Sequence, residues 1–307
     1  MNNIITKVKN LELETLENIK SSRAANTTRA YKSDFNDFEK FCNEFNLKSM
    51  PAEAKTISIY ITYLSKKAKF STIKRRLASI KVFHNLTGKY IDLKHPIINE
   101  NIRSIKRKIG TFQKAKKPIS IDQLKNIILE TDKEKYVKDK LRNKALILIG
   151  FSGAFRRSEL VSISIEDLDF TEKGVAIFIR KSKTDQSGEG MLKAIPYIDN
   201  ANFCPVLSLK KWVKYLKENN IKEKKIFNMS DKNVALILKK YVKKIGLTSF
   251  DYSGHSLRSG FATSTAESGA TERDIMSITG HKSSQMVRRY IHQSNIFKNS
   301  ALKKLKI

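Results

Sequence analysis

Residues 144–161 read KALILIGFSGAFRRSELV, and this stretch decides how the second half of the chain folds. The apolar run over residues 144–151 predicts a buried helix, and Gly153 ends it. Residues 158–161 predict that another helix begins almost at once. Arg156 is therefore expected on a tight turn between two helices, where its guanidinium can extend out of the core.

The elements around this stretch predict a mostly helical second half. Ser120 can cap a helix that begins it. Apolar segments at residues 175–179 and 192–196 predict two strands of a hairpin, joined by a long polar turn over residues 181–190. Helical apolar spacing recurs in four later stretches, which are residues 206–218, 232–245, 256–267 and 272–279. We expect a mainly α fold with a small antiparallel β-sheet.

The first half carries four helical patterns. The first can be capped by Thr27 or Thr28, and its apolar stripe is Tyr31, Phe35, Phe38, Cys42 and Phe45. Helical spacing makes this stripe core rather than a set of cofactor-stacking aromatics. Further patterns follow at residues 57–64, 71–83 and 99–109.

A polar, basic stretch closed by Pro118 separates the two halves, as is typical of an exposed linker. We therefore expect a helical N-terminal domain over residues 1–112, a linker over 113–118 and a second domain over 119–307.

The charge of the chain predicts a densely anionic partner. Lys and Arg number 60 against 30 Asp and Glu, a formal net charge of +30. Nucleic acid is the commonest such partner, and a merely basic protein is the alternative. Basic residues that could meet phosphates on the third and fourth helices are Lys74, Arg75, Arg76, Arg103, Lys106 and Arg107, with a solvated helix face as the other interpretation.

Several other classes are not favoured. No apolar run approaches the roughly 20 residues of a membrane-spanning helix. Residues 1–20 lack the apolar core of a secretory signal, so a cytoplasmic, nucleoid-associated protein is expected. Cys42 and Cys204 have no metal-ligand spacing, so we expect no disulfide and no metal.

Six residues of the second half form a candidate phosphodiester-cleaving site: Arg156, Lys183, His255, Arg258, His281 and Tyr290. Attack on a phosphodiester builds negative charge on the nonbridging oxygens, and Arg156 and Arg258 can clamp these oxygens with charged, planar forks. His255 precedes Arg258 by three residues, which places both on one helix face. A tyrosine hydroxyl with an ordinary pKa of about 10 needs a base or a strongly positive pocket to attack. Taken singly, these residues could equally be a helix-capping arginine, a solvated lysine and a half-buried tyrosine.

In order and spacing, the segments at residues 153–160, 181–185, 254–258 and 280–281, with Tyr290 nine residues after His281, resemble the tyrosine recombinase (phage integrase) family. The resemblance implies a helical, SAM-like core-binding domain that begins near Thr28 and a catalytic domain from about residue 118. Phe155 and Arg157 depart from the common pattern. Arg156 rather than Arg157 keeps the three-residue interval to Glu159.

The resemblance also implies roles. Tyr290 would become linked to a DNA 3′-phosphate and expel a 5′-hydroxyl, with Lys183 as the general acid and His255 as the candidate base. His281 would hydrogen-bond the phosphate, and Glu159 would orient the basic residues. Because the phosphotyrosine bond conserves the energy of the broken bond, rejoining needs neither ATP nor metal, and no cofactor is expected.

Family members work as four protomers on two DNA sites and exchange strands through a Holliday junction. We therefore expect double-stranded DNA with inverted half-sites as partner, and a homotetramer. The segment from Asn295 to Ile307 could be a tail helix that docks on a neighbour, or one that folds back on its own domain. The few residues ahead of the first helix leave no room for an arm-binding domain, so a simple two-domain recombinase is expected.

Two other functions remain open. A type IB topoisomerase uses nearly the same residues but lets the cut strand rotate before resealing. A catalytically silent, architectural DNA-binding protein would have no physical need for a tyrosine beside this basic set.

Overall fold

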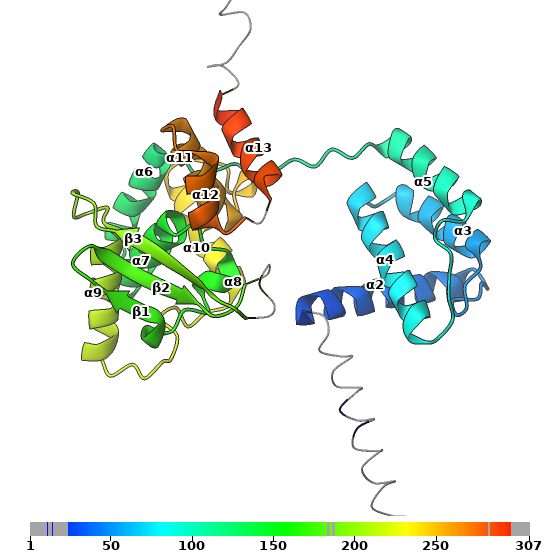
Figure 1. Ribbon diagram of the computed structural model, residues 1–307, viewed down its shortest axis with the longest axis horizontal. Coiled ribbons are helices and arrows are strands. Elements are labelled where there is room, and N and C mark those ends of the chain that lie inside the picture. The colour runs from blue at the N-terminus through cyan, green and yellow to red at the C-terminus, as the bar shows by residue number, and fades with distance from the viewer. Residues whose placement is uncertain are drawn as a thin grey trace, which may run out of the picture. The chain divides into compact units, whose positions relative to one another are not determined.

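The structure is a computed structural model that describes Leu11, Glu14 and residues 24–182, 185, 188–281 and 283–295. The backbone separates into two compact units, Met1–Lys114 and Ala115–Ile307. Each unit has a hydrophobic core of its own, and their elements are labelled in Figure 1.

The described part of the first unit is helical. Its helices are α2 (Ala25–Glu44), α3 (Ala54–Ser65), α4 (Phe70–Leu86) and α5 (Pro96–Ile109). Helix α2 packs on α4, and α3 packs on α5. Apolar residues at helical spacing form the core: Phe35, Phe38, Phe41, Cys42, Ile57, Tyr60, Ile61, Leu64, Ile73, Leu77, Ile80, Ile98 and Ile105. All four helices predicted for this half are confirmed.

Two details of the first helix were predicted wrongly. Helix α2 begins at Ala25 with Ala24 as its N-cap, so Thr27 and Thr28 lie in the first turn and do not cap it. Phe45 follows the last helical residue and is 50% exposed, whereas Phe41 is buried. The chain leaves the helical path at Phe45, which carries that side chain away from the core.

Residues 110–120 between the two units form neither helix nor strand. From Lys117 onward the backbone is bound to the second unit. The Lys117 N–H donates to the Asp251 carbonyl at 2.8 Å, and the Ile119 N–H donates to the Ser256 carbonyl at 3.1 Å.

Two helices precede the turn that carries Arg156, and a third follows it. Helix α6 (Ile121–Asp132) begins at the predicted cap, where the Ser120 hydroxyl accepts from the Gln123 N–H at 3.3 Å. Helix α7 (Val137–Ser152) contains the apolar run of residues 144–151, and helix α8 (Arg157–Leu160) follows after four residues.

A three-stranded antiparallel sheet comes next, in the order β1-β2-β3. After the 3-10 turn η1 (Ile165–Asp167), its strands are β1 (Leu168–Phe170), β2 (Gly174–Ile179) and β3 (Met191–Pro196). The predicted hairpin is confirmed as β2 and β3. Strand β1 was not predicted, because three residues are too few to display a two-residue alternation.

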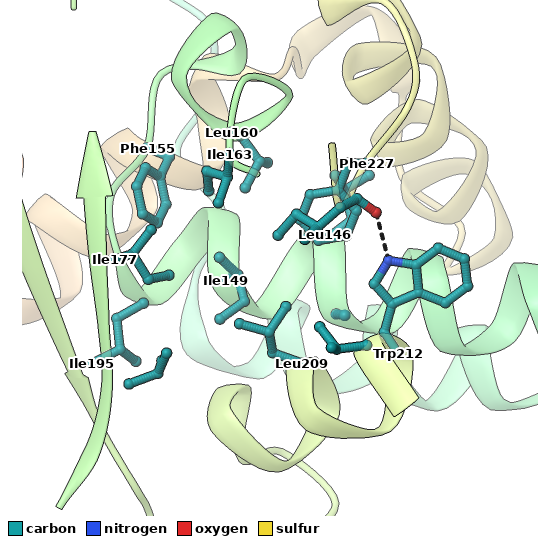
Figure 2. Packing of buried hydrophobic residues seen from close by; sticks show 14 of the residues in the cluster. Leu146, Ile149, Phe155, Leu160, Ile163, Ile177, Ile195, Leu209, Trp212 and Phe227 are labelled. Atoms are coloured by element: carbon teal, nitrogen blue, oxygen red, sulfur yellow. Dashed lines mark hydrogen bonds between the residues drawn. The ribbon is translucent and has the colours of Figure 1, made fainter. Parts of the chain in front are cut away.

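The sheet covers one side of the main core of the second unit, shown in Figure 2. Ile177 and Ile195 point from the sheet toward Ile149 of α7, and Leu209 and Trp212 close the core from α9 (Pro205–Glu218). The Trp212 indole N–H donates to the Ile226 carbonyl at 2.7 Å.

The remaining helices complete the second unit. They are α10 (Asp231–Lys244), α11 (His255–Glu267), α12 (Glu272–Thr279) and α13 (Ser284–Asn295), with the 3-10 turn η2 (Ser249–Asp251) before α11. Helix α11 packs against α7, α12 and α13. The predicted fold class, mainly α with a small antiparallel sheet, is confirmed.

Candidate active site

The turn between α7 and α8 holds Arg156 by a buried carboxylate. Glu159 accepts from the Arg156 backbone N–H at 2.9 Å and from its guanidinium Nη1 at 2.5 Å. The Glu159 side chain is 3% exposed and that of Arg156 is 19% exposed. Ala154, in the same turn, adopts a φ of 46°, a left-handed conformation that is uncommon outside glycine. One carboxylate therefore orients both the backbone and the side chain of Arg156.

Arg258, in the first turns of α11, is almost fully buried at 1% exposure. Its Nη1 donates to the Ala154 carbonyl at 2.7 Å, and its Nη2 donates to His281 Nε2 at 3.1 Å. Its Nε is buried without a hydrogen-bond partner, and among the described residues no carboxylate forms an ion pair with it. Burial, followed by the charge of Arg156, lowers the pKa of Arg258 to about 10. A buried cation with an unused donor is a site prepared for an anion.

His281 reaches Arg258 because α12 ends in a glycine. Gly280 adopts a left-handed φ of 64° at the C-cap, which turns the chain and brings His281 back toward the helix bundle. His281 is buried, and this burial, followed by the charges of Arg258 and Arg156, lowers its pKa to about 4. The imidazole is therefore neutral near pH 7.

Tyr290 lies on α13, with its ring centroid 6.2 Å from that of His281. The ring also packs against a small apolar cluster that includes Ala262 and Val287. Burial raises the pKa of Tyr290, and the charges of Arg258 and Arg289 oppose that rise. The tyrosine is thus half-buried beside His281 and within range of the charge on Arg258.

His255 is the first residue of α11 and lies three residues before Arg258. Its side chain reaches solvent, but the protein atoms around the ring remove part of its hydration. This desolvation, followed by the charges of Arg258, Arg156 and Arg157, lowers the pKa of His255. A neutral imidazole is the form that can accept a proton. With His255, the structure places five of the six candidate residues in one region together with Glu159; the other four are Arg156, Arg258, His281 and Tyr290.

The sequence matches the phage integrase family over residues 117–295 and the phage integrase N-terminal SAM-like domain over residues 13–87. The first match spans more than half of the chain. The chain belongs to the phage integrase family.

A relative and two solved structures extend this result. The integrase/recombinase xerD homolog of Selenomonas ruminantium is 41% identical over 96% of this chain and 89% of its own length. The Tn1549 transposon integrase in complex with transposon right end DNA is 15% identical, with a TM-score of 0.65 over 93% of this chain and 97% of that chain. The XerH site-specific recombinase bound to palindromic difH substrate is 19% identical, with a TM-score of 0.62 over 81% of this chain and 70% of that chain.

These matches confirm three predictions about this phage integrase family member. The resemblance to tyrosine recombinases holds, the enzyme class is that of DNA strand breakage and rejoining, and the N-terminal domain is SAM-like. In the part of the chain that the structure describes, no helix is both long enough and apolar enough to cross a membrane.

Lys193 belongs to this cluster and was not predicted from the sequence. Its side chain is 4% exposed, and its Nζ donates to the Gly153 carbonyl at 2.6 Å. Burial lowers the pKa of Lys193 to about 7; the nearby charge of Glu159 opposes this shift, and those of Arg258 and Arg156 add to it. The sequence held a signal, because alternation along the predicted strand places Lys193 on the same face as the apolar Ile195.

Thr279 was also missed. Its hydroxyl lies 2.8 Å from His281 Nδ1 and donates to the Ile275 carbonyl at 2.6 Å. Nothing in the apolar spacing of α12 distinguishes this threonine from an ordinary core residue.

Two predicted features lie outside the described residues. They are Lys183 and the tail beyond Asn295. Two residues further along the sequence from Lys183, the Asp185 carboxylate accepts from the backbone N–H groups of Gly188, Glu189 and Gly190 at 2.9 to 3.2 Å. Asp185 therefore organises the described end of the β2–β3 turn.

The predicted DNA contacts of the first unit divide into two groups. Lys74, Arg75, Arg103, Lys106 and Arg107 are exposed. Arg76 is only 18% exposed and is held within the unit, because it forms ion pairs with Asp34 and Asp37 and donates to the Tyr60 hydroxyl at 3.0 Å. A contact between these residues and DNA stays a prediction.

Proposed function

We propose that this protein is a site-specific recombinase that cleaves and rejoins double-stranded DNA through a 3′-phosphotyrosyl bond at Tyr290. The observation that carries the proposal is Arg258, a buried guanidinium whose Nε has no partner among the described residues. Arg258 is hydrogen-bonded to His281, and its charge acts on Tyr290. A DNA phosphate would supply the negative charge that balances this guanidinium and the oxygen that accepts from its Nε.

In the proposed cleavage step, the Tyr290 hydroxyl oxygen attacks the phosphorus and the bond from phosphorus to the 5′-oxygen breaks. His255 takes the phenolic proton, and Lys183 gives a proton to the departing 5′-oxygen. Negative charge that develops on the nonbridging oxygens meets Arg156 and Arg258. His281 belongs to the same phosphate site, next to Arg258.

Rejoining reverses this step. A 5′-hydroxyl from another strand attacks the phosphotyrosine, the new phosphodiester forms, and the tyrosine recovers its proton. The number of phosphoester bonds does not change, so ATP is not needed, and Arg156 and Arg258 would supply the positive charge that a metal ion could otherwise provide. We further propose that four protomers exchange two pairs of strands through a Holliday junction on sites with inverted half-sites. The palindromic substrate of XerH supports the half-site arrangement.

Covalent trapping tests the proposal. Nicked duplexes tiled from the DNA that flanks the gene are incubated with the protein in EDTA without ATP, and detergent-resistant adducts are isolated. The nick lets the short 5′-ended fragment diffuse away after cleavage, so the covalent complex accumulates. We expect an adduct in which peptide mapping places a 3′-phosphate on Tyr290.

Matched variants make the test specific. Tyr290→Phe is expected to abolish the adduct while DNA binding persists, and Tyr136→Phe, at a tyrosine 64% exposed elsewhere in the same unit, is expected to keep it. Specific binding of wild type without any adduct would indicate an architectural protein. Relaxation of supercoiled plasmids of any sequence would indicate topoisomerase activity instead.

A further inference from the structure

Arg157, which departs from the family pattern directly after Arg156, touches the segment that carries His255. It is the first residue of α8, and its side chain is 40% exposed. The aliphatic part of this side chain, its stem, lies against Gly254, the buried residue directly before His255. A methyl group on Gly254 would lie 2.3 Å from Cδ and 2.6 Å from Cγ of Arg157. The chain neighbours of Arg156 and His255 are therefore in contact.

This contact, rather than the backbone, explains why position 254 has no side chain. Gly254 has a φ of −59° and a ψ of −17°, a right-handed helical conformation that alanine adopts readily. The three atoms nearest to a methyl group at this position all belong to Arg157. Carbon atoms in contact stay about 3.5 Å or more apart, so the arginine stem and a side chain at position 254 cannot both occupy this place.

Helix α10 holds the far end of the Arg157 side chain. The guanidinium Nη2 lies 3.5 Å from the carboxylate of Asp231, in the first turn of α10. The two side chains are 40% and 43% exposed, so this ion pair adds little stability by itself. It does direct the stem across Gly254. Arg157 therefore links α8 to the first residues of both α10 and α11.

His255 is surrounded by positive charge from several elements. Desolvation is the largest cause of its lowered pKa, followed by the charges of Arg258 on its own helix, Arg156 in the turn and Arg157 on α8. His281, which follows α12, also interacts electrostatically with it. The acidic residues that pair with Arg156 and Arg157 are Glu159 and Asp231.

We propose that Arg157 is a positioning residue of the cleavage reaction, whose stem, packed on Gly254, sets the distance between Arg156 and His255. This inference rests on the proposed function, since it takes Arg156 as a phosphate clamp and His255 as the base. The charge of the same side chain has a second effect, because it favours the neutral imidazole that accepts the phenolic proton. Arg157 acts on the reaction through its neighbours and without touching the phosphate.

The alternative is that Arg157 is an ordinary surface arginine whose weak ion pair has no effect on the site. The effect of a substitution at position 254 would then not depend on the residue at position 157. Variants of Arg157 separate the stem from the charge: alanine removes both, methionine keeps the stem alone, and lysine keeps both.

A double-mutant cycle in the trapping assay tests the contact. Gly254→Ala is expected to slow adduct formation roughly tenfold, because the displaced stem shifts His255 relative to Arg156. In an Arg157→Ala background the same substitution should cause no further loss, because the methyl group then has room. An equal loss in both backgrounds, or no loss in the wild-type background, would refute the proposal. If Gly254→Ala does not fold, recovery of folding in the double variant supports the contact, and failure of both variants to fold contradicts it.

The pH dependence of adduct formation separates positioning from a general structural defect. Arg157→Met removes a positive charge near His255, so the pKa of His255 should rise and the acid limb of the profile should move to higher pH. Arg157→Lys should restore the wild-type profile. The control Lys214→Met, at a side chain 76% exposed, should leave the profile unchanged. A methionine variant that is slowed by the same factor at every pH would overturn the proposal.

Proton NMR titration of the full-length protein measures the pKa of His255 without DNA. His255→Gln assigns its signal among the five histidines. An unchanged pKa of His255 in Arg157→Met would count against the inference about Arg157. Wild-type protein that forms no adduct would instead count against the proposed function, because the titration does not depend on cleavage.

Discussion

Replacing Lys193 with methionine should remove a pH dependence of stability that this one side chain imposes. Lys193 lies on β3, its Nζ donates to the Gly153 carbonyl, and the same atom lies 4.5 Å from the centroid of the Phe155 ring. Burial lowers its pKa from 10.5 to about 7. Methionine has a similar length and flexibility and no charge, so it fits the same space.

The direction in which stability changes with pH follows from proton binding. Between about pH 7 and 10.5 the unfolded chain holds a proton on Lys193 that the folded protein has released, so the free energy of unfolding rises with pH across this window. The pKa difference corresponds to at most about 5 kcal/mol over the whole window, and to about 2.5 kcal/mol between roughly pH 7.5 and 9.5. The neutral variant lacks this contribution.

Denaturant unfolding followed by tryptophan fluorescence measures this pH-dependent contribution of Lys193 to the free energy of unfolding. Trp212 is the chain's single tryptophan and is buried in the core of the second unit, so its emission reports the unfolding of that unit. We expect the free energy of unfolding of the wild type to rise, relative to that of Lys193→Met, by about 2.5 kcal/mol from pH 7.5 to 9.5.

The control is Lys214→Met, at a lysine whose side chain is 76% exposed, and it should show no such shift. A difference between wild type and Lys193→Met that stays constant over the same pH range would refute the reasoning. It would mean that Lys193 keeps its proton in the folded protein.

Four other perturbations have expected outcomes. Arg76→Met should destabilise the first unit by about 2 kcal/mol in thermal melts followed by circular dichroism, because Asp37 loses its ion-pair partner and the buried Asp34 keeps only Arg75. Lys74→Met should leave stability unchanged and lower the salt slope of DNA binding by about 0.9. The free energy of unfolding, measured with denaturant, should fall by at most about 3 kcal/mol as the pH drops from 6.5 to about 4, because the unfolded chain binds a proton that buried His281 does not bind. The fall should be smaller in His281→Asn. Gly280→Ala should cost about 1–2 kcal/mol in the same unfolding assay, since its φ of 64° strains any side chain.

The sequence by itself determined the hairpin, the family and the described helices other than α13 (Ser284–Asn295), which was not predicted. Ser120 caps α6 as predicted, and α12 has the predicted bounds, because capping and apolar spacing are local properties that a window of residues contains. The order and intervals from Arg156 to Tyr290 likewise lie in the chain itself, and the family matches confirm the class of enzyme that they predicted.

Tertiary structure alone decided which polar groups meet. Lys193 binds a carbonyl 40 residues away, and Arg258 binds one 104 residues away. Neither partner carries a side-chain signal, because each is a backbone carbonyl that only the packing of α7, β3 and α11 brings into reach. Arg76 was interpreted as a candidate DNA contact for the same reason, since its carboxylate partners lie on another helix.

The surroundings of His281 show the same division within the site. The sequence placed a histidine before Tyr290, but only the folded chain brings Thr279 to one of its ring nitrogens and Arg258 to the other. A local pattern specifies residue types, whereas hydrogen-bond direction is set by donors and acceptors that meet only after folding.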